Sequence, residues 1–536
     1  MAWYDEAIFY HIYPLGMTGA PKHNNYGEPE HRLNTLIPFI SKIEELGCNA
    51  LYIGPLFESV GHGYETTDYK KLDTRLGTNE DLANFVGECH KQGIRVILDG
   101  VFNHTGRDFF AFKDIKQNRE SSRYKDWYCN VNFYGNNEYN DGFSYDNWGG
   151  YDLLAKLNQN NSEVREYIAD VIRFWVKEFD IDGIRLDAAD VLDFSYMKMM
   201  RSVANEIKTD FWLMGEVIHG DYVRWVNGET LHSVTNYHLH KALYSGHNDH
   251  NYFEIAHTVK RLYEMGGNRP DGLKLYNFVD NHDVERIYTK LTNKKHFVPV
   301  HILLYTLPGV PSLYYCSEYG IEGKKQYGSD DSLRPAISYE QYVKETESND
   351  LIKLISRLGE IRKEEKALSY GDYKELLLTN CQYVFSRSYN GQSVIVAVNN
   401  SDNDFVMNIP VQSEGEYTGK ITGTKAYVKD GVLSCNLKAN SGEIFVSSGK
   451  TDDVVKLIEI KIEPEIKEEK PFKKEDKIVE TESKQNRSYE EMTVEELQEA
   501  IIRRMEQNGP VTERMKQDVL ENVYHNSLVT WIKSFN

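Results

Sequence analysis

The chain has 536 residues and a formal net charge of −20 at pH 7, with 27% charged and 40% hydrophobic residues. This length predicts a large core and more than one domain, and the acidic charge argues against a nucleic-acid partner, because nucleic-acid binding depends on basic surface. No apolar run approaches the roughly 20 residues of a membrane span, and the opening residues lack a basic segment leading into an apolar stretch, so we expect neither a membrane partner nor a secretory signal.

Strand-like and helix-like segments alternate from Ile8 to about Gly359, as a (β/α)8 barrel requires. The first strand, IFYHIYP, begins at Ile8. The third, RVILDGV from Arg95, is apolar on both faces, as in a parallel sheet that is buried on both sides. Pro38 is tolerated near the start of the first expected helix, where no N–H is needed. Helices with one apolar stripe are predicted at Thr35–Leu46, Glu163–Phe179 and Tyr252–Met265.

Polar residues cluster at the C-terminal ends of several of these strands, where the active sites of such barrels lie. Taken singly, each would usually be a helix cap, a turn residue, an ion-pair partner or a structural histidine. Four such segments in chain order favour a functional site instead. They are DGVFNHT from Asp99, GIRLD from Gly183, GEV from Gly215 and FVDNHD from Phe278.

The carboxyl groups in these segments have different surroundings. In GIRLD the side chains alternate, so Arg185 and Asp187 share a face, and the cation is expected to lower the pKa of Asp187 and keep it ionised, as a nucleophile requires. Glu216 ends the apolar run WLMGEV, where desolvation favours the protonated form of a general acid. Asp283 follows His282 and could bind sugar hydroxyls and stabilise positive charge. The set fits an oxocarbenium-like transition state.

The four ordered segments resemble the conserved regions of the α-amylase superfamily of glycoside hydrolases, over roughly residues 5–450. The resemblance implies that Asp187 is the catalytic nucleophile, Glu216 the general acid/base and Asp283 the transition-state stabiliser. It also implies that the sugar subsite at the point of cleavage is lined by Arg185, His104 and His282. Within the superfamily, the segments FNHTGRDFFAF, RYKDWY and KLN are most similar to cyclomaltodextrinases and neopullulanases.

Three further segments extend the resemblance. GYETTDY, from Gly63, is similar to the segment that supplies a stacking tyrosine, here Tyr64, and an aspartate, here Asp68. DDSLRP implies a sugar contact for Arg334, and a local ion pair is an equally good interpretation. In LPGVPSLYYCSE, Cys316 occupies a place that usually holds Gly, which concerns the local backbone rather than the chemistry.

Composition and the resemblance together predict five parts. The stretch between the third strand and the helix near Ser162 is rich in aromatic residues, and the resemblance makes it a small inserted domain that walls the substrate cleft. Most of its rings are expected in its own core, with one or two on sugar. The parts are a (β/α)8 TIM barrel (1–104 and 159–365), the inserted domain B (105–158), an antiparallel β-sandwich with Asn-Gly and Asp-Gly turns (366–450), a charged linker (451–487) and a helical hairpin (488–536).

The helical tail departs from the family pattern. Thr493 and Glu496 form a predicted capping box, and a second helix is expected from Thr512 to about Lys533. The hairpin could bind a protein partner, mediate self-association, or pack on its own chain. The sequence favours none of these.

No metal is predicted to be required. Many α-amylases bind calcium through a His four positions after the nucleophile, and that place here is Val191, although Asn103 is retained. Calcium binding therefore stays an alternative at an incomplete site. The segment from His232 to His257 holds six histidines without a known ligand spacing, so sugar or surface roles are expected for them. The six cysteines show no paired spacing, as expected for reduced thiols in a cytoplasmic protein.

These observations predict a cytoplasmic retaining glycoside hydrolase that cleaves α-1,4-glucosidic bonds of maltodextrins or cyclomaltodextrins. The reaction would pass through a covalent glycosyl enzyme at Asp187. A 4-α-glucanotransferase, in which a second sugar replaces water, uses the same residues and is the nearest alternative. A catalytically inactive carbohydrate-binding scaffold is a further alternative, which the intact carboxylate set disfavours. The expected partner is an α-glucan oligosaccharide.

Overall fold

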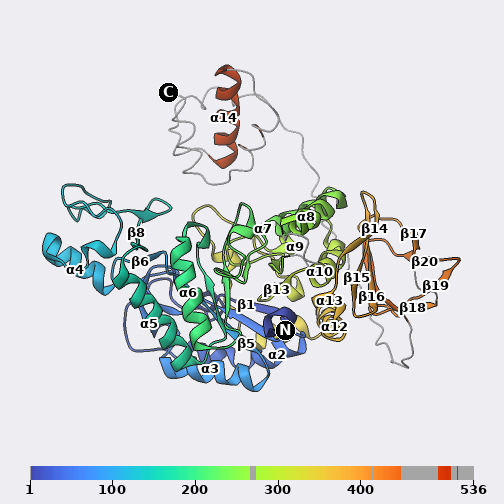
Figure 1. Cartoon of the computed structure of the whole chain (residues 1–536), viewed down its shortest axis with the longest axis horizontal. Helices are drawn as coiled ribbons and strands as arrows, with labels where there is room; N and C mark the ends of the chain where they lie inside the picture. The colour runs from blue at the N-terminus through green and yellow to red at the C-terminus, as the bar shows by residue number, and fades with distance from the viewer. Residues whose placement is uncertain are drawn as a thin grey trace, which may run out of the picture. The chain divides into compact units, whose positions relative to one another are not determined.

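The computed structural model describes residues 2–265, 273–411, 415–447 and 493–508, together with 516 and 519 (Figure 1). The chain divides into two compact units, residues 1–464 and 465–536. Within the described residues, no helix combines the length and apolar character needed to cross a membrane.

The first unit is built on a sheet of eight parallel strands in the order β11-β10-β9-β5-β2-β1-β13-β12. A parallel bridge between Thr235 and Tyr276 joins its two end strands and closes the barrel. The predicted (β/α)8 fold is therefore confirmed. The strands are β1 (Phe9–Ile12), β2 (Ala50–Ile53), β5 (Arg95–Gly100), β9 (Gly183–Leu186), β10 (Trp212–Gly215), β11 (Ser233–Val234), β12 (Tyr276–Phe278) and β13 (Val310–Tyr314).

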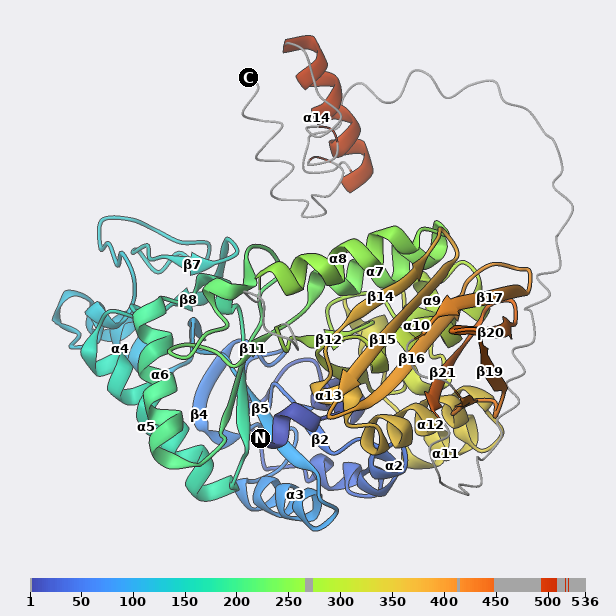
Figure 2. The ribbon, with the colours of Figure 1, turned by 45° about the vertical axis from the view of Figure 1, so that its right-hand side comes forward.

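Helices cover the outside of this barrel, and α5 and α6 lie side by side against it (Figure 2). Helix α5 begins where Asn161 accepts hydrogen bonds from the N–H groups of Glu163 and Val164, and it buries Trp175 against Phe57. The larger helices are α2 (Phe39–Glu45), α3 (Asn79–Lys91), α5 (Ser162–Phe179), α6 (Phe194–Ile207), α7 (Tyr237–Asn248), α8 (Tyr252–Met265), α10 (Phe297–Thr306), α11 (Tyr339–Thr346) and α12 (Asp350–Glu364). The short ones are α1 (Pro14–Met17), α9 (Ile287–Lys290) and α13 (Ala367–Tyr370).

Two of the three predicted helices match closely, and the first is shorter than expected. Helix α2 begins at Phe39 rather than Thr35, because Pro38 stands at the N-cap, the position at which its missing N–H costs no helical hydrogen bond. The residues before it form a 3-10 turn, Arg32–Leu36.

The region after the third barrel strand carries a small sheet in the order β6-β8-β7, and a separate hairpin, β3–β4, follows the second strand. These elements are β3 (Phe57–Ser59), β4 (Thr66–Leu72), β6 (His104–Gly106), α4 (Phe110–Asn118), β7 (Asn147–Trp148) and β8 (Tyr151–Lys156). Much of the aromatic content here is core, as expected. Buried rings include Trp127, Tyr128, Phe143 and Tyr145, whereas Tyr134, Tyr139, Trp148 and Tyr151 are exposed.

A second eight-stranded sheet, antiparallel throughout, follows the barrel in the order β14-β15-β16-β21-β18-β19-β20-β17. Its tight turns fall at Asn390-Gly391 and Asp430-Gly431, where all four residues have positive φ, as predicted for these dipeptides. Arg387 donates to the carbonyl of Thr306 on α10 at 2.8 Å and ties this sheet to the barrel. The strands are β14 (Lys374–Leu378), β15 (Gln382–Tyr389), β16 (Gln392–Asn399), β17 (Phe405–Pro410), β18 (Glu416–Gly419), β19 (Lys425–Lys429), β20 (Val432–Leu437) and β21 (Ser441–Ser447).

In the second unit the structure describes helix α14 (Val494–Asn508). The predicted capping box is confirmed, since the Thr493 N–H donates to the Glu496 carboxylate at 2.9 Å and the Glu496 N–H donates to the Thr493 hydroxyl at 3.2 Å. Leu497, Ile501 and Val519 form a small buried cluster. The predicted charged linker and most of the predicted second helix lie outside the described residues.

Candidate active site

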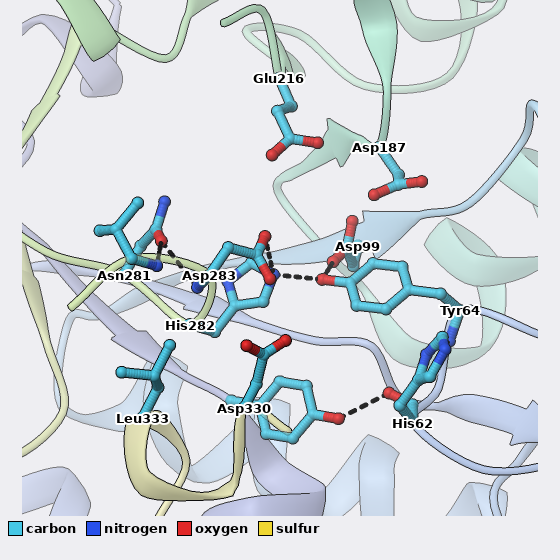
Figure 3. A network of polar contacts seen from close by, with 12 residues as sticks. His62, Tyr64, Asp99, Asp187, Glu216, Asn281, His282, Asp283, Asp330 and Leu333 are labelled. Atoms are coloured by element: carbon cyan, nitrogen blue, oxygen red, sulfur yellow. Dashed lines mark hydrogen bonds and ion pairs between the residues drawn. The ribbon is translucent and has the colours of Figure 1, made fainter. Parts of the chain in front are cut away.

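A single buried arginine organises the carboxylates at the C-terminal ends of the barrel strands. Arg185, on β9, contacts Asp99 through Nη1 at 2.8 Å, Asp187 through Nη1 at 2.9 Å and Glu216 through Nη2 at 2.9 Å. The three carboxylates follow or end three neighbouring parallel strands, β5, β9 and β10, so the barrel order alone brings them together. Figure 3 shows the carboxyl groups of Asp187, Glu216 and Asp283 turned toward one common space.

The charge balance of this cluster favours retention of a proton. Burial raises the pKa of Asp187 well above its ordinary range, and the neighbouring Glu216 and Asp99 act in the same direction. Arg185 lowers this pKa, as the sequence indicated, but its effect is outweighed, so the expected net lowering was wrong. With one cation among three carboxylates, the raised pKa of Asp187 indicates that this carboxyl group tends to hold a proton.

Glu216 is held by two further donors. The Ala188 N–H donates to Oε2 at 3.2 Å, and the Tyr237 hydroxyl donates to Oε1 at 3.3 Å. Ala188 adopts a left-handed conformation with φ 45°, which is unfavourable for a residue with a Cβ. This strained residue directly follows Asp187, so the same turn that ends β9 also aims a backbone donor at Glu216.

Asp283 lies in the opposite electrostatic environment. Its carboxylate is 3.1 Å from Nε2 of His282 and 2.8 Å from Nη2 of Arg334. Although burial acts to raise the pKa of Asp283, His282 and Arg334 hold it well below its ordinary range. Arg334 also donates to the carbonyl of His282 at 2.9 Å and contacts Asp330 at 3.1 Å. Arg334 thus makes the local ion pair that the sequence offered as one of its two interpretations.

Tyr64 and Asp99 complete the floor of the site. The Tyr64 hydroxyl donates to Asp99 at 3.2 Å, and Tyr52 donates to the same carboxylate oxygen at 2.8 Å. The Tyr64 ring lies nearly parallel to the His282 ring, with centroids 5.8 Å apart. Asp99 is not among the site residues predicted from the sequence. Its position near the C-terminal end of an apolar strand, where it pairs in register with Arg185, was the available signal.

His104 contacts a hydrogen-bonded chain of two side-chain amides, those of Asn103 and Gln159. Its Nε2 is 3.1 Å from the Tyr64 carbonyl, and its Nδ1 is 3.2 Å from the Asn103 side-chain amide. Burial lowers the pKa of His104 to about 4, so the ring is neutral at pH 7. The Asn103 side-chain oxygen accepts from Gln159 at 3.0 Å, and Gln159 accepts from the Asp193 N–H at 2.6 Å.

Asn103 in this amide chain and Val191 are the two positions that concern calcium binding. The Asn103 oxygen that could have been a ligand already accepts a hydrogen bond from Gln159, and the Val191 side chain offers no donor atom. Across the described ranges, no group of three or more His, Cys, Asp or Glu side chains could hold a metal ion. Val191 therefore removes one ligand from the calcium site that the resemblance describes, and calcium stays an alternative at an incomplete site.

One predicted substrate contact, Asp68, lies apart from the carboxylate cluster. Asp68 lies on β4, where it alternates with the buried Tyr69, and its carboxylate accepts from the Lys70 N–H at 2.8 Å. Tyr69 instead points toward the residues that follow β5, where its hydroxyl donates to the carbonyls of Val101 and His104 at 2.6 and 2.9 Å. Among the described residues, the structure gives Asp68 no contact with the carboxylate cluster.

The histidines of the segment from His232 to His257 also differ from expectation. His240 and His247 are buried, and their rings lie 2.9 Å from the Val279 carbonyl and 2.6 Å from the Leu243 carbonyl, respectively. The surface or sugar roles expected for them were wrong, because these residues are on the inner face of α7. All six cysteines are free thiols, as predicted.

This arrangement has the parts that glycosidic cleavage needs: two carboxyl groups held by one arginine, of which Asp187 has a raised pKa, and a third carboxylate whose pKa is lowered. Fold and site together define a glycoside hydrolase built on a (β/α)8 barrel. Residues 32–350 match the family model for the α-amylase catalytic domain, and residues 371–445 match the model for the α-amylase C-terminal domain. The chain belongs to the α-amylase family.

Similar proteins agree with this membership. A cyclomaltodextrinase of Thermoanaerobacter pseudethanolicus is 30% identical over 429 residues, which cover 76% of this chain and 72% of the relative. An intracellular maltogenic amylase of Bacillus subtilis is 29% identical over 384 residues, covering 68% of this chain and 63% of the relative. A solved cyclomaltodextrinase structure superposes with a TM-score of 0.73 at 25% identity, covering 83% of this chain and 78% of that chain.

Proposed function

We propose that this chain is a retaining hydrolase of α-1,4-glucosidic bonds in maltodextrins or cyclomaltodextrins. The observation that carries the proposal is the contact of one guanidinium, that of Arg185, with both Asp187 and Glu216. This contact fixes the two carboxyl groups beside each other at one side of the common space. The substrate class is supported by the relatives, which are named as a cyclomaltodextrinase and a maltogenic amylase.

In the proposed reaction, Glu216 carries a proton and Asp187 is ionised when substrate is bound. Glu216 gives this proton to the leaving glycosidic oxygen while Asp187 attacks the anomeric carbon and forms a covalent glycosyl enzyme. Glu216 is then ionised, and it takes a proton from the water that releases the sugar. Arg185 stabilises whichever member of the pair is ionised, since it contacts both.

The remaining residues would bind and polarise the sugar. Asp283 is ionised and stabilises the positive charge that develops on the sugar ring. Tyr64 offers a ring face for stacking. His104 and His282 would line the sugar subsite and act through the groups that they hold, the Tyr64 backbone and the Asp283 carboxylate. For Arg334 we favour a positioning role, because its contacts with Asp283 and the His282 carbonyl fix the stabilising carboxylate.

A product analysis on maltoheptaose, β-cyclodextrin, pullulan and starch tests the proposal. Hydrolysis should yield short maltodextrins with one new reducing end for every bond cleaved. Products longer than the starting maltoheptaose, formed without new reducing ends, would instead identify a 4-α-glucanotransferase. Failure to cleave any of the four glucans by the folded protein would overturn the proposed substrate class.

We further propose a cytoplasmic location, supported by the relative named as intracellular and by six free cysteines. For the tail, we propose that the helix α14 and the residues after it bind a protein partner or a second copy of the chain. The buried cluster of Leu497, Ile501 and Val519 supports a folded element with its own small core.

A further inference from the structure

The β7–β8 hairpin of the inserted region presents two aromatic rings at its tip. Its turn is Gly149-Gly150, and both glycines have positive φ, 66° and 83°, as a two-residue turn between antiparallel strands requires. The turn pairs Trp148 directly with Tyr151. Directly opposite residues of an antiparallel pair point to the same face, so both rings lie on one side of the hairpin.

These two rings are exposed although the same region buries others. Trp148 is 39% and Tyr151 is 54% exposed, whereas Phe143 in the same region is fully buried. A Cβ at Gly149 would lie 3.3 Å from the Tyr151 ring, so this glycine allows the ring to lie close over the turn. Exposed apolar side chains that are grouped on one face, rather than scattered singly, are typical of ligand-binding grooves.

The hairpin stands beside the catalytic site. The Trp148 ring centroid is 5.9 Å from that of His104, with 31° between the planes. His104 is bonded to the Tyr64 backbone, and Tyr64 contacts Asp99 in the floor of the site. The Trp148 ring therefore lies one side chain away from the groups that surround the bond to be cleaved.

We propose that Trp148 and Tyr151 form an aromatic platform that binds a glucose ring of the substrate in the subsite next to the one lined by His104. This proposal rests on the proposed function, because it takes the substrate to be a glucan chain. The C–H faces of a glucose ring are apolar and pack on a flat aromatic face, while the hydroxyls at the ring edge stay in water. The platform would thus strengthen the binding of longer glucan chains. It would take no part in the chemical step, which the carboxylates carry out.

Kinetics on a long and a short substrate test the platform. For Trp148→Ala we expect kcat/KM on maltoheptaose to fall about 10-fold, mainly through KM, as when an aromatic binding contact is truncated. The value on 4-nitrophenyl α-glucoside, whose one sugar fills only the subsite at Asp187, should be unchanged. Tyr151→Ala should give a smaller loss of the same kind, and Trp148→Phe should retain most of the affinity. The control is Tyr134→Ala, a 99% exposed ring of the same region, which should change neither value.

Equal losses on both substrates would overturn the platform and assign Trp148 to the support of His104. An unchanged KM for maltoheptaose would also overturn it. Calorimetry with maltoheptaose on a Glu216→Gln background separates this proposal from the proposed function. If the wild type cleaves maltoheptaose and Trp148→Ala changes neither kcat/KM nor binding, the platform alone is overturned. If the folded protein neither cleaves nor binds maltoheptaose, both the platform and the proposed function are overturned. If Trp148→Ala weakens binding of maltoheptaose, the platform is supported even where cleavage is absent.

Discussion

Replacing Arg185 by Met should destabilise the fold and increase the dependence of its stability on pH. The guanidinium contacts Asp99, Asp187 and Glu216 at 2.8 to 2.9 Å, so its removal leaves buried carboxylates without their cation. Removing one partner of a buried ion pair costs about 3–5 kcal/mol. Met keeps most of the side-chain volume, so the loss is electrostatic rather than a packing defect.

The sign of the pH dependence follows from the pKa of the cluster. The pKa of Asp187 is already raised in the folded chain by burial and by Glu216, and loss of Arg185 raises it further. The folded state then holds a proton that the unfolded state has released above about pH 4. Stability is therefore lost as the pH rises from about 4 through the raised pKa, and it is recovered as the pH falls.

Urea unfolding followed by tryptophan fluorescence at pH 5 and pH 8 measures the effect. We expect the deficit of Arg185→Met relative to wild type to be larger at pH 8 than at pH 5. The matched control is Arg173→Met, whose exposed contacts with Glu166 and Glu206 at 3.6 and 3.3 Å are worth about 0–1 kcal/mol. A deficit that is the same at both pH values, or no larger than that of the control, would refute the reasoning.

Three further outcomes are expected. Glu216→Gln should lower kcat by roughly 10² to 10⁴ on maltodextrins, with a smaller loss on an aryl maltoside, whose good leaving group needs little protonation; equal losses would count against a general acid. Chelation with EDTA should leave the melting temperature and activity unchanged, because Val191 supplies no ligand at the place of the usual histidine, and a drop restored by calcium would contradict this. Removing the residues after Ser448 should leave kcat on maltotriose intact, since the last proposed catalytic carboxylate is Asp283. A truncated protein that unfolds would show that the tail belongs to the catalytic unit.

The barrel and most of its site could be predicted because they depend on local patterns. Apolar runs marked the strands, and parallel strands bring their C-terminal ends to one edge of the barrel. The carboxylates of Asp187, Glu216 and Asp283 therefore had to converge once the strands were recognised. The Asn-Gly and Asp-Gly turns were predictable for a similar reason, since these dipeptides tolerate positive φ.

The orientation of Asp68 was not predictable from alternation alone. In the β3–β4 hairpin the pairing register shifts on both sides of Glu58. Each shift changes which residues point to a given side of the hairpin. The side on which Asp68 lies therefore depends on irregularities that cannot be predicted from the sequence pattern. Tyr69 consequently points toward the residues that follow the C-terminal end of β5, whereas Asp68 points elsewhere.

The charge state of Asp187 required the three-dimensional structure. Alternation in β9 correctly predicted that Arg185 would contact it. The net pKa, however, depends on burial and on two further carboxylates that come from other strands, Asp99 and Glu216. Opposed contributions of this kind are decided by distances, which a one-dimensional pattern does not contain.

The most direct test of the central claim is the anomeric configuration of the first products released from maltoheptaose, followed by proton NMR before mutarotation. A covalent glycosyl enzyme at Asp187 inverts the anomeric carbon twice, so we expect the new reducing ends to appear first as the α-anomer and to equilibrate later. The β-anomer as the first product would show a single displacement by water and would contradict the assignment of Asp187 as the nucleophile.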